Sequence, residues 1–212
     1  HSFPTRRSSD LPVFDANIAL GRRHDRDVDV DNVTGTLQAM SQAGINKALV
    51  YASHSVSFDS QEGNELLSEM IEGQPRLVPQ FVCNPPWDHL DSFALNVKRE
   101  NVSSIKMFPL LDNYPFTDWV VNSWMKWLTS EHIPLWIIAD QVDPVTFYDT
   151  IKVHPNITVV LSEVHYSHYA WVMPLLRSLP NLCIEISRFF ITDGISRLID
   201  TIGEKRILYG SG

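Results

Sequence analysis

The stretch RILYG (206–210) decides the fold, because it is the eighth of eight short runs rich in β-forming residues. The first seven runs are PVFDA (12–16), KALVYA (47–52), LVPQFVC (77–83), SSIKMF (103–108), PLWIIA (134–139), TVVLSEV (158–164) and LCIEIS (182–187). Amphipathic segments of helix length separate them, at residues 33–43, 60–72, 89–99, 119–131, 143–153, 169–178 and 193–203. Eight strands and seven helices predict a (β/α)8 TIM barrel, as a fragment that ends at strand eight and lacks the last helix.

An open, doubly wound sheet would show the same alternation of strands and helices. It would usually carry a glycine-rich phosphate-binding turn after its first strand, and FDANIALGRR (14–23) is not such a turn. The strand count and the missing turn both favour the barrel. Local signals support the helices: Asp143–Pro144 and Asp31 or Asn32 can begin them, and Gly44 and Gly73 can end them.

The first eleven residues, HSFPTRRSSDL, match the translation of one frame of a common sequencing adapter. We expect residues 1–11 to be an artefact outside the fold, and residues 12–212 to form one truncated barrel domain. The arginine pair in this segment is not an export signal, because no apolar run follows it.

The composition limits the classes of partner. The chain has 17 Lys and Arg against 25 Asp and Glu, a net charge of −8, and no basic cluster after residue 11, which argues against nucleic acid. No apolar run is long enough to span a bilayer. Cys83 and Cys183 stand in apolar settings without metal-type spacing, as expected in a reducing compartment. We expect a cytoplasmic protein that binds a small molecule and contacts neither nucleic acid nor membrane; a homo-oligomer stays open.

Several segments in order resemble the amidohydrolase-related family, which includes metal-dependent hydrolases and decarboxylases akin to the aminocarboxymuconate semialdehyde decarboxylases. These segments are FDANIALG (14–21), SSIKMFPLLDNYP (103–115), IPLWII (133–138), HPNITVVLSEVH (154–165), LPNLCIEIS (179–187) and KRILYGSG (205–212). In the family, the first of these segments corresponds to Asp-x-His-x-His on strand one and the second to Gly-x-Lys-x-x-Pro on strand four. The last corresponds to a segment that ends in Gly-Ser-Asp on strand eight. The resemblance covers almost all of residues 12–212.

The resemblance implies a divalent metal such as zinc, held by histidines and by an aspartate at the end of strand eight. The corresponding positions here are Asn17, Ala19, Ile138 or Ala139, Glu163 and Gly212. Alanine and glycine have no ligand atoms in their side chains. We therefore expect no cofactor and no metal ligand among the site residues.

Polar residues persist at the strand ends, where the active sites of this architecture lie. Alternation along a strand places Asp15 with Asn17, and Glu163 with His165, toward the mouth of the barrel. We expect Lys106 to stabilise an anion, Glu163 or Asp15 to act as a base, and His165 to move a proton. The alternative for Lys106 is a structural salt bridge with Asp15 or Glu163.

Asn17, Arg22, Arg188 and Tyr166 are the expected substrate-binding residues. Arg22 or Arg23 could hold an anionic group, although the charged run GRRHDRDVDVD (21–31) is better explained as a solvated surface. Another arrangement left open is a new metal site formed by Asp15, Glu163, His165 and Glu185.

The resemblance implies an amidohydrolase-related hydrolase, or a decarboxylase that acts as a carbon–carbon lyase. Together with the polar residues at the strand ends, it leads us to expect a small carboxylate-bearing substrate and no metal centre of the usual kind. The competing hypothesis is a catalytically inactive barrel that serves as a small-molecule binding or interaction protein. Loss of every expected ligand is what the second hypothesis predicts.

Overall fold

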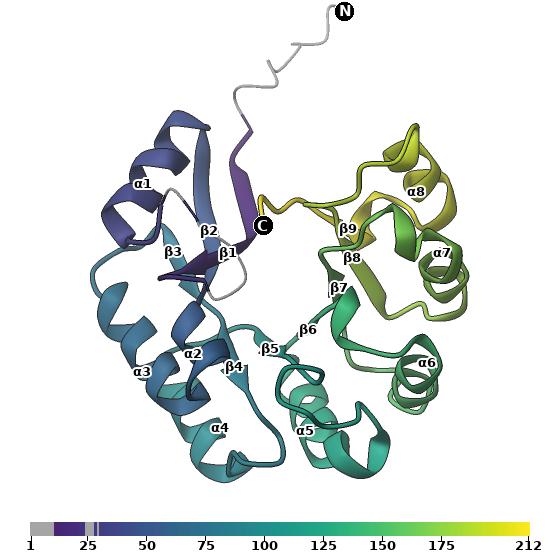
Figure 1. Ribbon diagram of the computed structural model, residues 1–212, viewed down its shortest axis with the longest axis horizontal. Helices are drawn as coiled ribbons and strands as arrows, with labels where there is room; N and C mark the ends of the chain where they lie inside the picture. Colours follow the sequence, from purple (N-terminus) through teal and green to yellow (C-terminus); the bar gives the residue numbers. More distant parts are fainter. Residues whose placement is uncertain (1–10, 24–27, 29) are drawn as a thin grey trace, which may run out of the picture.

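A computed structural model describes residues 11–23, 28 and 30–212 (Figure 1). The predicted adapter segment, residues 1–11, lies outside the described residues except for Leu11. Part of the charged run 21–31 lies outside them as well.

The strands run parallel to their neighbours around a central ring (Figure 1). They are β1 (Val13–Leu20), β2 (Ile45–Ala52), β3 (Leu77–Pro79), β4 (Phe81–Cys83), β5 (Ile105–Met107), β6 (Leu135–Ile138), β7 (Val159–Ser162), β8 (Leu182–Glu185) and β9 (Ile207–Leu208). The hydrogen-bonded order is β1-β2-β3 in one sheet and β4 to β9 in chain order in the other.

Backbone hydrogen bonds join the two sheets into a barrel. The Ala16 amide donates to the Tyr209 carbonyl at 2.9 Å, which connects β1 to the segment after β9. At the other junction the predicted strand 77–83 is divided at Gln80, whose amide donates to Val50 O at 2.8 Å while the Phe81 amide donates to Ser104 O at 3.3 Å. Pro79, just before the division, has no amide hydrogen to donate. The predicted eight-stranded barrel is confirmed, with its third strand divided.

Helices surround the strands (Figure 1). They are α1 (Val33–Gln42), α2 (Ser53–Ser57), α3 (Ser60–Met70), α4 (Leu90–Arg99), α5 (Asp118–Ser130), α6 (Pro144–Lys152), α7 (Tyr169–Ser178) and α8 (Gly194–Ile202). All but α2 were expected. Asn32 caps α1 by accepting from the Gly35 amide, and Asp143 caps α6 by accepting from the Val145 and Thr146 amides. Gly44 and Gly73 both adopt φ of +72°, as expected of residues that follow helices.

Three short 3-10 turns, η2 (Ala139–Gln141), η3 (Tyr166–His168) and η4 (Glu204–Arg206), complete the described elements. Among the residues described, β9 is the last element, and every helix is too short or too polar to cross a bilayer.

The core lies on both sides of the strand ring. Ile105, Leu135 and Val159 point outward and pack with buried helix residues such as Met125 and Phe147. The alternate residues face the inside of the barrel. There an inner apolar layer forms from Ala16, Leu49, Trp136 and Val160. Cys83 and Cys183 are free thiols, and burial raises the pKa of both.

Candidate functional site

Lys106 lies inside the barrel beside the apolar layer, because it alternates with the outward-facing Ile105 and Met107 on β5. Its side chain has no exposed surface. The ammonium donates to Asn17 Oδ1 at 2.9 Å and lies 4.1 Å from the centre of the Tyr51 ring. Burial lowers the pKa of Lys106 to about 8, although the carboxylates of Glu163 and Glu185 favour its charged form.

Glu185, at the end of β8, is connected to Lys106 through the Asn17 amide, which both side chains contact. Its Oε2 accepts from Asn17 Nδ2 at 3.2 Å, from the Glu163 amide at 3.2 Å and from Ser187 Oγ at 3.0 Å, and Oε1 accepts from the Ser187 amide. Burial raises the pKa of Glu185, and these hydrogen bonds oppose the rise. A carboxylate with this many donors is held in place and has little capacity left for a substrate.

Glu163 differs from Glu185 in having one oxygen without a partner. Arg188 Nε lies 3.2 Å from Glu163 Oε2, whereas the buried Oε1 has no hydrogen-bond partner among the described residues. Glu163 follows β7 directly and has φ of +53°, in the left-handed region that is uncommon for residues other than glycine. Such outliers gather at functional sites when the surrounding structure holds them.

A cavity of about 190 Å³ opens beside Glu163. Its walls are formed by Arg23, Tyr51, Ser53, Val56, Phe108, Leu111, Ile138, Asp140, Gln141, Glu163 and Arg188. The aromatic rings of Tyr51 and Phe108, which the Lys106 ammonium contacts, belong to this wall, while Lys106 itself does not. Lys106 therefore acts on the cavity through its charge rather than by direct contact.

The structure places Asp15 away from the other predicted catalytic residues. Asp15 and Asn17 do not share one face, because the β1–β2 pairing is irregular between Asp15 and Ile18. Asn17 turns into the barrel, whereas Asp15 lines a different cavity with Thr36 and Met40 of α1. Asp15 Oδ1 accepts from the Ser211 and Asn17 amides. Asp15 and Asn17 therefore do not form the pair that we expected at the mouth, because the irregularity in β1 turns the two side chains in different directions.

Only one of the four predicted substrate-binding residues lines the cavity. That residue is Arg188, whereas Asn17 lies outside the cavity wall and accepts a hydrogen bond from Lys106. Arg22 is exposed, and Tyr166 on η3 is 75% exposed; neither lines the cavity. Of the two alternatives in the charged run, Arg23 is the arginine in the cavity wall.

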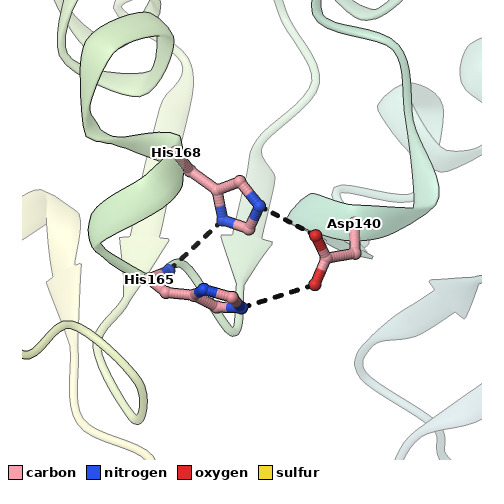
Figure 2. A group of neighbouring side chains, drawn as sticks. All are labelled: Asp140, His165 and His168. Carbon is pink, nitrogen blue, oxygen red and sulfur yellow. Dashed lines mark hydrogen bonds and ion pairs between the residues drawn. The ribbon is translucent and has the colours of Figure 1, made fainter.

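His165 meets two residues at the rim of the mouth (Figure 2). Asp140 on η2 points one oxygen toward each of two imidazole rings: Oδ1 lies 2.8 Å from His168 Nε2, and Oδ2 lies 3.5 Å from His165 Nε2. His168, in η3, also accepts from the His165 amide through Nδ1 at 3.3 Å. Asp140 belongs to the cavity wall, so this group borders the same cavity as Glu163.

The family's metal positions do not fit a metal ion in this chain. The Asn17 amide is occupied by Lys106 and Glu185, and the Lys106 ammonium stands where a second cation would be repelled. Ala19 and Ile138 pack in an apolar cluster with Tyr51, and Gly212 has no side chain. The alternative set of Asp15, Glu163, His165 and Glu185 is not brought together either, since Asp15 faces α1 and Glu185 is saturated.

Asp140, His165 and His168 do have ligand atoms within 4.8 Å of one another. The expectation of no metal ligands therefore applies only to the positions that correspond to the family's ligands, and not to this group. Sequence reasoning noted the two histidines as rim residues and missed Asp140. The sequence did contain a signal for Asp140. It directly follows the strand PLWIIA (134–139), just as His165 directly follows the neighbouring strand TVVLSEV (158–164), so both lie at the same end of the barrel.

Comparisons with known proteins identify the family and the fold. The sequence profile of the family described as Amidohydrolase (Amidohydro_2) matches residues 17–212, which confirms the predicted resemblance. A search of curated proteins gave no match.

Solved structures share the fold at low identity. An uncharacterised TIM-barrel protein of Bordetella bronchiseptica aligns with a TM-score of 0.71 and 11% identity, over 94% of this chain and 85% of its own. Amidohydrolase 2 of Bifidobacterium longum subsp. infantis has a TM-score of 0.64 and 17% identity, over 95% and 84%. A probable 2-pyrone-4,6-dicarboxylic acid hydrolase of Acinetobacter baumannii, with citric acid bound, has a TM-score of 0.68 and 13% identity, over 94% and 83%.

Proposed function

The chain belongs to the amidohydrolase family, and from this premise we propose that it is a hydrolase or decarboxylase for a small carboxylate-bearing substrate, with no metal at the family's ligand positions. The reaction takes place in the cavity lined by Glu163 and Arg188. The observation that carries the proposal is Glu163 itself: a buried carboxylate with one oxygen paired with Arg188 and the other without a partner among the residues that the structure describes.

Charge in the cavity wall supports an anionic substrate. Arg23 and Arg188 both line the cavity, and a guanidinium can bind a carboxylate through two parallel hydrogen bonds. The Lys106 ammonium lies beneath the aromatic wall and adds positive potential without touching the substrate. Charges act strongly in a site from which water is largely excluded.

In this proposal Glu163 Oε1 accepts a proton from the water that attacks the substrate, and Arg188 holds the substrate carboxylate in register with it. Glu163 then returns this proton to the leaving group, while His165, at the rim, moves protons between the site and the solvent. A decarboxylation would use the same arginines to hold the carboxylate and the same cationic wall to stabilise the electrons left on carbon. Asp15 Oδ2 is also buried without a hydrogen-bond partner among the described residues, but Asp15 is the weaker candidate for the base because it lines a different cavity, beside α1.

The known proteins support the substrate class. The Acinetobacter protein is named for a dicarboxylic acid and has citric acid bound, and both are small polycarboxylates. In this chain we propose the small molecule as the main partner, with no role for nucleic acid or membrane, and a homo-oligomer as one arrangement of the protein. Two free cysteines suit the reducing cytoplasm, which we propose as its compartment.

The test is turnover on a panel of carboxylated lactones, amides and β-keto acids. We expect Glu163→Gln to lower kcat/KM by about 10²- to 10⁴-fold on any substrate found, the range for loss of a general base. Arg188→Met should mainly raise KM. Glu204→Gln, at an exposed residue, serves as the matched control and should leave both constants unchanged. Full activity in Glu163→Gln would contradict the proposal.

The second candidate function is a catalytically inactive barrel that binds a small molecule or a partner. The specific observation in its favour is that the family's ligand positions, Asn17, Ala19, Ile138, Glu163 and Gly212, do not together form a metal site. It predicts no turnover by the wild type on the whole panel, together with citrate binding that Arg188→Met weakens and Glu163→Gln does not.

A further inference from the structure

We propose that Asp140, His165 and His168 form a binding site for a zinc-class divalent cation at the rim of the cavity. This site lies away from the positions at which the family holds its metal. As a binding site it does not depend on the proposed function, since cation affinity can be measured without any substrate.

The donor set has the composition that zinc prefers. Two imidazoles and one carboxylate bind zinc well, and a site with three protein ligands leaves a fourth position for water or substrate. The three ligand atoms already lie within 4.8 Å of one another, so that modest side-chain rotations bring them to a common ion. Figure 2 shows Asp140 facing both rings from η2, while the histidines come from the segment between β7 and α7.

The surroundings of His165 favour its role as a ligand. Ser167 Oγ lies 3.2 Å from His165 Nδ1, which gives that nitrogen a hydrogen-bond partner. When Nδ1 carries the proton and donates to the serine, Nε2 is left as the atom that faces Asp140 with a lone pair. The ring is 34% exposed, so a cation can reach it from solvent.

His168 carries its ring proton on the nitrogen that would bind the cation, so the proposal makes a specific prediction about pH. Its Nδ1 accepts from the His165 amide, and therefore Nε2 of the neutral ring carries the proton that is donated to Asp140. A metal at Nε2 must displace this proton, which then moves to Nδ1 or to solvent, and the 3.3 Å bond from the His165 amide is given up. Zinc and a proton thus compete for the same place, and binding weakens as the pH falls.

The location connects the cation site to the cavity. Asp140 lines the wall that also contains Glu163 and Arg188. An ion held by Asp140 therefore lies at the entrance to the cavity, where its open position can take up a water or a substrate oxygen.

A matched control exists elsewhere on the surface. His154 Nε2 lies 2.6 Å from Asp118 Oδ1, an imidazole–carboxylate pair like that of His168 and Asp140. Within the described part of the chain, this pair belongs to no group of three ligand residues. It tests whether one histidine beside one aspartate is enough to bind zinc.

The experiment is calorimetric titration of the chelator-treated full chain with ZnCl₂ at pH 7.5. We expect one zinc per chain, an affinity lowered by more than about tenfold in His165→Ala and in His168→Ala, and no change in His154→Ala. MgCl₂ should give at least about a hundredfold weaker binding, because magnesium prefers an all-oxygen shell. Titrations in buffers with different ionisation enthalpies should show protons released on binding.

Absence of zinc binding by the wild type would overturn the proposal. So would an affinity that stays unchanged in both His165→Ala and His168→Ala, or one that falls equally in His154→Ala. Should an alanine variant fail to fold by circular dichroism, Asp140→Asn provides the test, since it keeps the shape of the side chain and removes the charge that a cation needs. Loss of zinc binding with intact catalysis in His168→Ala, a residue without a role in the proposed reaction, would leave the proposed function standing. Intact zinc binding in a Glu163→Gln variant that has lost catalysis would leave the cation site standing.

Discussion

Two layers fill the inside of the barrel, and they obey different rules. The inner apolar layer, which contains Trp136 and Val160, follows the alternation of residues along each strand. The inner polar layer combines Lys106 and Glu185, which follow that alternation, with Asn17 and Glu163, which do not. Asn17 enters through the irregularity in β1, and Glu163 through a left-handed backbone after β7. Regular strands build the packing and half of the polar layer, and irregular residues complete that layer.

The largest expected effect lies in the apolar layer. Trp136 is 2% exposed, and Trp136→Ala should lower the free energy of unfolding by about 3–5 kcal/mol, because it removes buried apolar surface and leaves a cavity. Trp119, on α5, is 79% exposed, and Trp119→Ala should change stability by less than about 0.5 kcal/mol. Urea denaturation measures both. Equal losses in the two variants would mean that Trp136 is not a core residue.

A somewhat smaller effect, and one that depends on pH, is expected in the polar layer. The pKa of Lys106 is about 8, below its ordinary value of 10.5, so between these values the unfolded chain holds a proton that the folded chain has lost. Stability therefore rises with pH in this window, by an amount on the order of 3 kcal/mol for a shift of this size. The charged ammonium costs stability below pH 8.

Denaturation curves recorded from pH 7 to 10.5 isolate this contribution by difference. Lys106→Met should lack the rise, while Lys47→Met, at an exposed residue, should keep it. A rise that persists in Lys106→Met would show that Lys106 has an ordinary pKa.

The smallest effect concerns the contact between the polar layer and the strand that closes the barrel. A Cβ at Gly210 would lie 2.5 Å from Glu185 Oε1 and 3.0 Å from Asn17 Cβ. Gly210→Ala should therefore displace Glu185 and cost about 1–3 kcal/mol, as overpacking usually does. Ser211→Ala, at the exposed neighbouring residue, is the control, with a change of less than about 0.5 kcal/mol. Thermal unfolding distinguishes the two, and an unchanged Gly210→Ala variant would show that Glu185 has room to move.

The sequence predicted the fold more completely than the site. Seven helices lie where periodicity placed them, and the caps at Asn32 and Asp143 form as expected. The helix α2 was missed because SHSVS (53–57) is too short to show an apolar period. The division of strand 77–83 depends on which neighbours pair with it, and such pairing is tertiary information.

The positions of side chains could be predicted where the residues belong to a regular strand. Lys106 lies inside the barrel because β5 alternates without interruption, and Arg188 reaches Glu163 from beyond β8. Asp15 was misplaced because a strand irregularity leaves no mark in the residues themselves. Asp140 was missed because its contact with His165 and His168 depends on β6 and β7 being neighbours in the barrel, which is tertiary information.

The complete enclosure of Lys106 has a consequence for labelling chemistry. Acylating reagents attack the neutral amine, and a pKa of about 8 makes Lys106 neutral far more often than a surface lysine at the same pH. No reagent can reach it in the closed barrel, however, because none of its surface is exposed. Its modification must wait for the strands to separate, so the rate at which mass spectrometry detects an acylated Lys106 measures how often the barrel opens.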